Sequence, residues 1–171
     1  MADFNPAFDK MIHNEGGFQL IDIAADRGGQ TYAGIARNFH PNWPGWRYID
    51  SKDTTNPQLT ALVRDFYKQQ FWDKVSGDAL ARQSTAEAIF DFAVNAGTGT
   101  AAKLAQIVVG TVPDGSIGPV TQEKLNALDE AVFVTKYALA KVARYAQICN
   151  KDRSQTKFLL GWINRTIGGL A

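Results

Sequence analysis

His13-Asn14-Glu15-Gly16-Gly17 is the stretch at which the first predicted helix, residues 4–14, comes to its end. Asn5-Pro6 is typical of a helix start, because Asn is a good N-cap and Pro at the first helical position loses only an unused N–H. Gly16 and Gly17 stop the helix, since Gly readily takes the left-handed geometry of a C-terminal cap. Apolar side chains then fall on one face of the run, which predicts an amphipathic helix; they are Phe4, Phe8, Met11 and Ile12.

Glu15 continues that apolar face, four residues after Met11 and three after Ile12. Burial disfavours a charged carboxylate, and the C-terminal end of a helix carries partial negative charge. Both effects favour the protonated acid that general acid catalysis requires. The alternative interpretation is that Glu15 is the solvated last residue of a frayed turn, since helix ends shift by a residue or two.

The composition is that of an ordinary globular protein: 171 residues with 45% hydrophobic and 20% charged residues, enough for one compact domain, possibly bilobed. A net charge of +1 gives no electrostatic footprint for nucleic acid or an acidic membrane. No apolar run approaches the roughly 20 residues of a membrane span, and no secretory signal is recognised. We therefore expect neither a nucleic-acid partner nor stable membrane insertion. We also expect the protein to be made in the cytoplasm.

The cysteine and histidine pattern excludes two further classes of site. The single cysteine, Cys149, rules out an internal disulfide, and its apolar helical surroundings predict a buried small hydrophobe rather than a reactive thiol. His13 and His40 are isolated in sequence, with no spacing typical of metal ligands. We expect no metal and no cofactor.

Residues 18–36 carry β-type side chains and a tight-turn signal, which predict a small β-lobe directly after Glu15. Residues 37–56 read as an irregular loop, in which Trp43 and Trp46 either cover the edge of the core or form a wall on which sugar rings stack. The lobe also carries polar groups suited to a site, although a turn uses Asp for its own hydrogen bonds; they are Asp22, Asp26, Thr31 and Tyr32.

The remainder of the chain predicts helices over about 57–74, 84–96, 101–109, 119 onward, 130–150 and 154–167. Ser84 and Glu87 fit a capping box at the start of one of them. Glu87, Asp91 and Asn95 form a polar row on that helix, which is either a solvated face or one side of a saccharide groove. The fold class is therefore mainly α, a helical bundle with a small β-lobe.

Five ordered blocks of sequence, HNEGG, DRGGQTYAGIA, FDFAVNAG, LAQIVVGTVPDGSIGPVTQEKLNAL and KFLLGWINR, resemble the glycoside hydrolase family 108 muramidases, which include phage and prophage endolysins. The second half resembles the peptidoglycan-binding module that accompanies this family, with its D-G-x-I-G-x-x-T signature at Asp114, Gly115, Ile117, Gly118 and Thr121. The resemblance implies an α+β lysozyme-like fold. Its expected parts are a muramidase lobe over 1–92 and a helical peptidoglycan-binding lobe over 93–171, packed as one compact unit.

The resemblance also implies a reaction, hydrolysis of the β-1,4 bond between N-acetylmuramic acid and N-acetylglucosamine, with Glu15 as the catalytic general acid. Phage-type lysozymes space a Glu, an Asp and a Thr much as Glu15, Asp26 and Thr31 are spaced here. We therefore assign Asp26 as base or electrostatic partner, with Asp22 as its alternative, and Thr31 as the group that positions water, giving net inversion. The substrate-binding residues are expected to be Tyr32, Asp91 and Asn95.

The expected partner is the glycan strand of peptidoglycan, met by a monomer in the periplasm or cell wall after release by a holin or a secretion system. Three other interpretations stay open. A lytic transglycosylase also needs one acid/base Glu, a wall-binding secretion accessory protein would lack turnover, and a small helical interaction protein would have no carbohydrate role.

Overall fold

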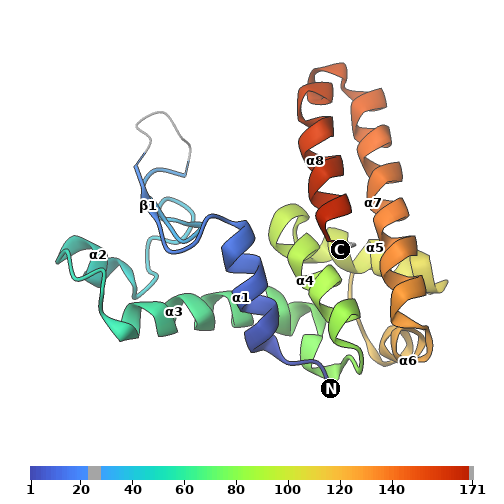
Figure 1. Ribbon diagram of the computed structural model, residues 1–171, viewed down its shortest axis with the longest axis horizontal. Helices are drawn as coiled ribbons and strands as arrows, with labels where there is room; N and C mark the ends of the chain where they lie inside the picture. Colours follow the sequence, from blue (N-terminus) through green and yellow to red (C-terminus); the bar gives the residue numbers. More distant parts are fainter. Residues whose placement is uncertain (23–27, 170–171) are drawn as a thin grey trace. The chain divides into compact units, whose positions relative to one another are not determined.

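The computed structural model describes residues 1–22 and 28–169. In this part of the chain it contains eight α-helices and one three-stranded antiparallel sheet (Figure 1), which confirms the mainly α class with a small β part. Contacts divide the chain into two compact units, Phe4–Gln70 and Phe71–Ala171 together with Met1–Asp3. The lobe boundary expected between residues 92 and 93 stays a prediction.

The first unit contains three helices and the sheet. Its elements are α1 (Phe4–Asn14), β1 (Leu20–Ile21), β2 (Thr31–Tyr32), β3 (Ile35–Ala36), α2 (Trp46–Asp50) and α3 (Pro57–Tyr67). The strands follow the order β1-β2-β3, with Leu20 opposite Tyr32 and Tyr32 opposite Ile35. The β-lobe predicted after Glu15 is therefore present.

The core of the first unit lies between α1 and α3. Phe8 is fully buried and meets the ring of Tyr67 edge-on, with 5.9 Å between centroids. Arg64 of α3 covers the same Phe8 ring at 4.5 Å and pairs with Asp9 at 2.6 Å. An apolar face closed by an exposed ion pair is the usual arrangement for two amphipathic helices, and the burial rather than the ion pair stabilises it.

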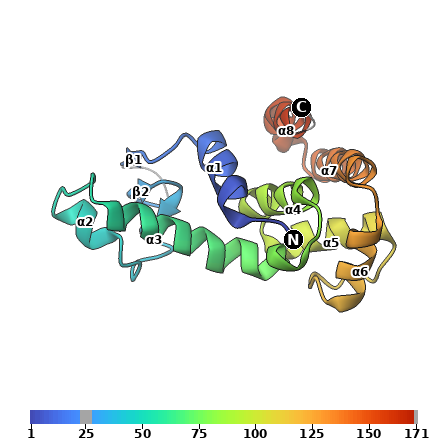
Figure 2. The ribbon, with the colours of Figure 1, turned by 60° about the horizontal axis from the view of Figure 1, so that its bottom comes forward.

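The second unit is helical in all its described elements. They are the short 3-10 helices η2 (Asp73–Val75), η3 (Gly77–Ala79) and η4 (Arg153–Gln155), and the helices α4 (Gln83–Ala96), α5 (Thr98–Val109), α6 (Pro119–Ala127), α7 (Glu130–Lys151) and α8 (Thr156–Gly168). Helices α7 and α8 run side by side as a hairpin in both views (Figures 1 and 2), in agreement with their contacts. Fully buried Ala93 and Ala105 let α4 and α5 approach closely.

Several helix ends differ from the prediction. Helix α1 begins at Phe4, so Asn5 and Pro6 lie inside its first turn. Helix α4 begins at Gln83 without a side-chain cap, so the capping box at Ser84 is wrong. The reason is that the helix begins one residue before Ser84, which therefore lies inside the first turn. The Glu87 side chain instead accepts a hydrogen bond from Gln83 Nε2 at 2.9 Å.

The helix predicted over about 57–74 starts as expected, with the Asn56 side chain accepting a hydrogen bond from the Gln58 N–H and Pro57 at the first position. Its α-helical part ends at Tyr67, and the chain continues as a π-helical segment, η1 (Lys68–Trp72).

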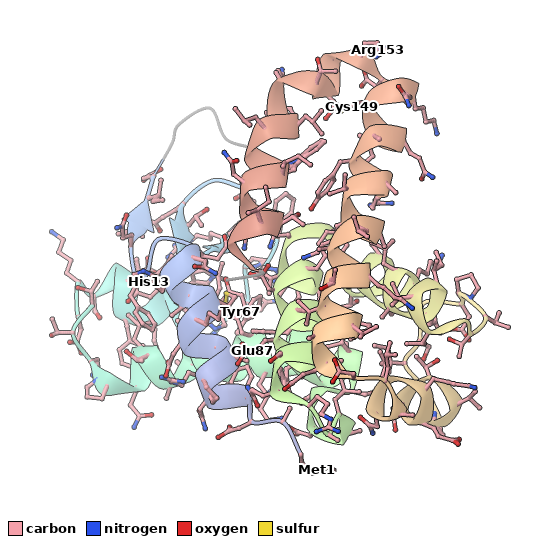
Figure 3. The ribbon with its side chains drawn as sticks, turned by 45° about the vertical axis from the view of Figure 1, so that its right-hand side comes forward. Met1, His13, Tyr67, Glu87, Cys149 and Arg153 are labelled. Atoms are coloured by element: carbon pink, nitrogen blue, oxygen red, sulfur yellow. The ribbon has the colours of Figure 1, made fainter. Side chains whose placement is uncertain are left out.

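Several apolar side chains of the last two helices are exposed. Phe158 of α8 is 47% exposed, and Leu139 and Val142 of α7 are also exposed. The hairpin arrangement explains this, because α8 packs mainly on α7 and leaves its other sides open. Cys149 is buried and free, as predicted, and lies near the end of α7 (Figure 3). No helix in residues 1–22 and 28–169 has the length and apolarity needed to cross a membrane.

Candidate functional site

Glu15 occupies the C-cap of α1, where the backbone is held by a Schellman motif. The Gly17 N–H donates to the Ile12 carbonyl at 2.8 Å, and the Gly16 N–H donates to the His13 carbonyl at 3.2 Å. Gly16 and Gly17 take φ of +90° and +79°, which L side chains rarely adopt. The two glycines therefore fix the direction in which Glu15 leaves the helix, and its side chain is half-buried.

Tyr67 lies close to Glu15, a relationship that the sequence did not suggest. Burial raises the pKa of the Tyr67 hydroxyl well above its usual range, and the negative charge of Glu15 raises it further. The same hydroxyl donates to the Ala33 carbonyl at 2.8 Å. Figure 3 shows Tyr67 beside α1, with His13 at the C-terminal end of that helix. One buried phenol is thus within electrostatic range of the predicted acid and bonded to the β-lobe.

The β-lobe presents its turn to Tyr67. Ala33 and Gly34 connect β2 and β3 with φ of +49° and +80°, the positive pair of a type I′ hairpin turn. A Cβ on Gly34 would collide with the Tyr67 hydroxyl. The Ala33 N–H donates to the Gln19 carbonyl at 3.0 Å, which holds the segment after Glu15 against the turn. A backbone hydrogen bond therefore ties the segment after α1 to the turn, and the Tyr67 hydroxyl ties α3 to the same turn.

The predicted site residues of the lobe occupy different environments. Thr31 is half-buried in β2, and its hydroxyl donates to the Gly29 carbonyl at 3.3 Å. Tyr32 is 3% exposed and stacks on Trp43, and burial raises its pKa. Asp22 is exposed directly after β1, whereas Asp26 lies outside the described residues. The structure thus brings Glu15, Thr31 and Tyr32 into one unit, and their roles stay predictions.

The tryptophan loop belongs to the core edge and also borders a cavity. Trp46 is buried and donates from Nε1 to the His40 carbonyl at 2.7 Å, while Trp43 packs edge-on against it. Trp43 further lines an open cavity of about 450 Å³ in the first unit, together with exposed Phe39 and the amide of Gln69. That volume is within the usual range for ligand pockets.

Asp91 and Asn95 lie in the second unit, where they line a cavity of about 240 Å³ between α4, α7 and α8. Asp91 Oδ1 accepts a hydrogen bond from Arg165 Nη2 at 3.1 Å. Asn95 Nδ2 donates to the Asp91 carbonyl at 2.7 Å. The polar row is therefore no simple solvated face, because its Asp is engaged by a cation from α8.

Two more cations face the same cavity. Lys141 of α7 is 8% exposed, and Arg144 is half-buried one turn further along. Burial lowers the pKa of Lys141, Asp91 opposes that change, and Arg165 adds to it. Sequence reasoning missed Lys141, although a lysine in register with buried residues four apart was the available signal; that row is Phe133, Tyr137, Tyr145 and Cys149.

The D-G-x-I-G-x-x-T signature is organised around a buried residue outside it, Gln106. Gln106 Nε2 donates to Asp114 Oδ1 at 2.7 Å and to the Ser116 carbonyl at 2.9 Å, and its Oε1 accepts from the Gly115 N–H at 2.9 Å. The hydrogen bond from Gln106 is the main reason why the pKa of Asp114 is lowered. These contacts account for the signature as a structural turn between α5 and α6. Within the described residues no cluster of His, Cys, Asp and Glu could hold a metal ion.

Comparisons with known proteins agree with this arrangement. Residues 8–97 match the family described as "Glycosyl hydrolase 108", and residues 100–167 match the one described as "Predicted Peptidoglycan domain". The solved structure of SagA from Brucella abortus is similar, with 25% sequence identity and a TM-score of 0.65 over 98% of this chain and 95% of that chain. No curated protein matches the chain.

The two matched segments contain the features described above. The first includes the end of α1, the sheet and α3, and the second includes the Gln106 turn and the α7–α8 hairpin. The family carries glycoside hydrolase activity, and the accompanying domain identifies peptidoglycan as the partner. Because residues 8–97 make up more than half of the 171, the chain belongs to the glycosyl hydrolase 108 family and is a peptidoglycan hydrolase.

Proposed function

We propose that the protein is an N-acetylmuramidase, which hydrolyses the β-1,4 bond between N-acetylmuramic acid and N-acetylglucosamine. Glu15 acts as the general acid. The observation that carries this proposal is the position of Glu15 at the glycine-fixed end of α1, half-buried and within electrostatic range of the buried Tyr67 hydroxyl. Glycosidases need such a carboxyl group in a partly desolvated place beside the substrate.

The remaining roles follow the chemistry of inversion. Glu15 gives its proton to the glycosidic oxygen as the bond from that oxygen to the anomeric carbon breaks. Water attacks the anomeric carbon from the opposite face, and Asp26 takes the proton of the water, with Asp22 as the alternative base. Thr31 positions that water. Tyr32, Asp91 and Asn95 are proposed contacts of the glycan strand, and the open cavity beside Phe39 and Gln69 offers aromatic and amide groups of the kind that hold sugars.

Digestion of purified sacculi followed by mass spectrometry of the soluble products tests the proposal. A muramidase releases fragments with reducing N-acetylmuramic acid ends. Fragments with anhydro ends would identify a lytic transglycosylase, and wall binding without soluble fragments would identify an accessory protein without turnover. Either of these two results contradicts the proposal.

Three variants separate the remaining residues. Loss of turnover in Asp26→Asn with activity retained in Asp22→Asn supports Asp26 as the base, and the reverse supports Asp22. Thr31→Val should lower turnover without preventing wall binding. Each variant is compared with Asp53→Asn, an exposed carboxylate in the loop before α3.

We further propose that the protein works as a monomer on the cell wall, after a holin or a secretion system has released it from the cytoplasm. The peptidoglycan domain supports the place of action. Sedimentation of the purified protein and detection of the native chain in periplasmic and wall fractions test the two statements. A stable dimer contradicts the first, and confinement to the cytoplasm contradicts the second.

A further inference from the structure

The cavity between α4, α7 and α8 carries more positive than negative charge. Three cations and one carboxylate line it, and that carboxylate, Asp91, is already paired with Arg165. Lys141 and Arg144 form no hydrogen bond or ion pair with any other residue in the described part of the chain. Among the residues that the structure describes, the lining therefore has three cations against one carboxylate, an excess of two positive charges.

The position of Lys141 is costly unless something enters the cavity. Its side chain is 8% exposed, and its ammonium lies over two aromatic rings, 5.4 Å from the Phe92 centroid and 5.3 Å from the Tyr137 centroid. Ring faces compensate only part of the lost hydration of a buried ammonium. An apolar side chain would pack at this place on α7 with less cost, so a lysine here indicates a ligand with negative charge.

The cavity also has apolar walls and a limited size. Tyr145 and Trp162 line it with their rings 5.2 Å apart, and Ile148 lies beside them. Its volume of about 240 Å³ is below the roughly 300–1,000 Å³ of most ligand pockets. It therefore suits an amino-acid-sized group that joins a carboxylate to a small apolar part, rather than a disaccharide, whose neutral hydroxyl groups need no excess cations.

We propose that this cavity binds a carboxylate of the peptide stems of peptidoglycan, with Lys141 and Arg144 holding the anion and Tyr145 and Trp162 packing against the adjoining residue. The proposal rests on peptidoglycan as the substrate of the chain. It adds a second recognition element, for the peptide part of the wall, to a site proposed for the glycan part. Asp91 pairs with Arg165 and is not among the proposed contacts of the peptide carboxylate, which leaves its proposed contact with the glycan strand unaffected.

Isothermal titration calorimetry on the full chain tests the proposal with a free stem tripeptide, L-Ala-γ-D-Glu-meso-diaminopimelate, and with its fully amidated form. We expect the carboxylate form to bind at least tenfold more tightly than the amidated form. Lys141→Met and Arg144→Gln should each weaken that binding at least tenfold, while Lys136→Met, an exposed lysine on the same helix, should leave it unchanged. The melting temperature of Lys141→Met should not fall, which separates lost binding from lost folding.

Several results would overturn the proposal. Equal binding of the amidated tripeptide would show that the carboxylate is not recognised. Unchanged binding in both variants would show that the tripeptide does not bind in this cavity. Equally tight binding of inorganic phosphate shows a general anion site rather than one for peptide stems. Hydrolysis of glycan strands stripped of their stems is measured separately on the unaltered protein, so a failure of the muramidase proposal is distinguished from a failure of this one.

Discussion

The hydroxyl of Tyr67 donates a 2.8 Å hydrogen bond to the carbonyl oxygen of Ala33, and this bond joins α3 to the turn between β2 and β3. The charge of Glu15 acts on the same hydroxyl. Helix α1 (through the ring of Phe8), the turn of the sheet and the end of α3 therefore meet at one buried phenol. The proposed acid acts on this phenol through its charge.

Tyr67→Phe should destabilise the protein by about 1–3 kcal/mol, because it leaves the Ala33 carbonyl without its donor. Turnover should also fall, since the turn that follows Thr31 and Tyr32 is no longer held. Urea denaturation and the sacculus assay measure the two effects. Tyr48→Phe is the control, because the Tyr48 hydroxyl only accepts an exposed hydrogen bond from Arg47. Equal stability of the two variants would show that the Tyr67 bond is unimportant.

Stability should fall as the pH rises above about 10. The pKa values of Tyr32, Tyr67 and Tyr137 are raised above 10.0, in each case chiefly by burial. A raised pKa means that the unfolded chain loses its phenolic protons first, so the stabilisation is complete below the unfolded pKa and is lost as the pH rises toward the folded one. Denaturation midpoints across this window measure the loss. In Tyr67→Phe the stability should fall less steeply with pH. An unchanged slope would contradict the contribution assigned to Tyr67.

Gly34→Ala should destabilise the protein more than Gly110→Ala, although both glycines have positive φ, +80° and +71°. Strain at positive φ alone costs about 1–2 kcal/mol. A Cβ on Gly110 meets open space, whereas one on Gly34 collides with the Tyr67 hydroxyl, which adds about 1–3 kcal/mol of overpacking. Equilibrium unfolding of both variants gives the difference. If Tyr67→Phe partly restores the stability of Gly34→Ala, the extra cost comes from the collision with the Tyr67 hydroxyl. If it restores none, the collision is not the cause.

Gln106→Leu should destabilise the second unit by at least about 2 kcal/mol, because the Gly115 N–H and the Ser116 carbonyl lose a buried partner. The change keeps the apolar packing volume nearly constant, so the loss reports the hydrogen bonds. Thermal unfolding measures it against Gln58→Leu, an exposed position on α3. A Gln106→Leu variant as stable as that control would show that the signature turn holds itself without Gln106.

The sequence was sufficient for the helix that ends at Glu15, the β-lobe, the buried Cys149 and the family. These features depend on local signals: a helical apolar period, two glycines, a turn cluster and motifs in order. The roles of Tyr67 and Gln106 could not be predicted, because their hydrogen-bond partners lie 34 and 9 residues away and no local rule joins them. The same holds for Lys141, whose significance depends on Asp91 and Arg165 from two other helices.

The exposed apolar side chains of α7 and α8 show that a local apolar pattern does not predict which of its side chains are covered. Apolar spacing marks one face of a helix, but how much of that face is covered depends on how many helices surround the hairpin, which periodicity does not encode. The exact start of a helix is equally hard to predict. Helix α4 begins one residue before Ser84, so Ser84 is not the capping residue, and Glu87 is bonded by Gln83 instead.

The most direct test of the central claim is the rate at which Glu15→Gln releases reducing ends from purified sacculi. Glutamine keeps the size of the side chain but has no proton to give to the glycosidic oxygen, and loss of general acid catalysis typically lowers rates by about 10²–10⁴. We expect such a loss with an unchanged circular dichroism spectrum and melting curve, while Glu123→Gln on the exposed face of α6 keeps full activity. Near-normal release of reducing ends by a folded Glu15→Gln variant would contradict the account.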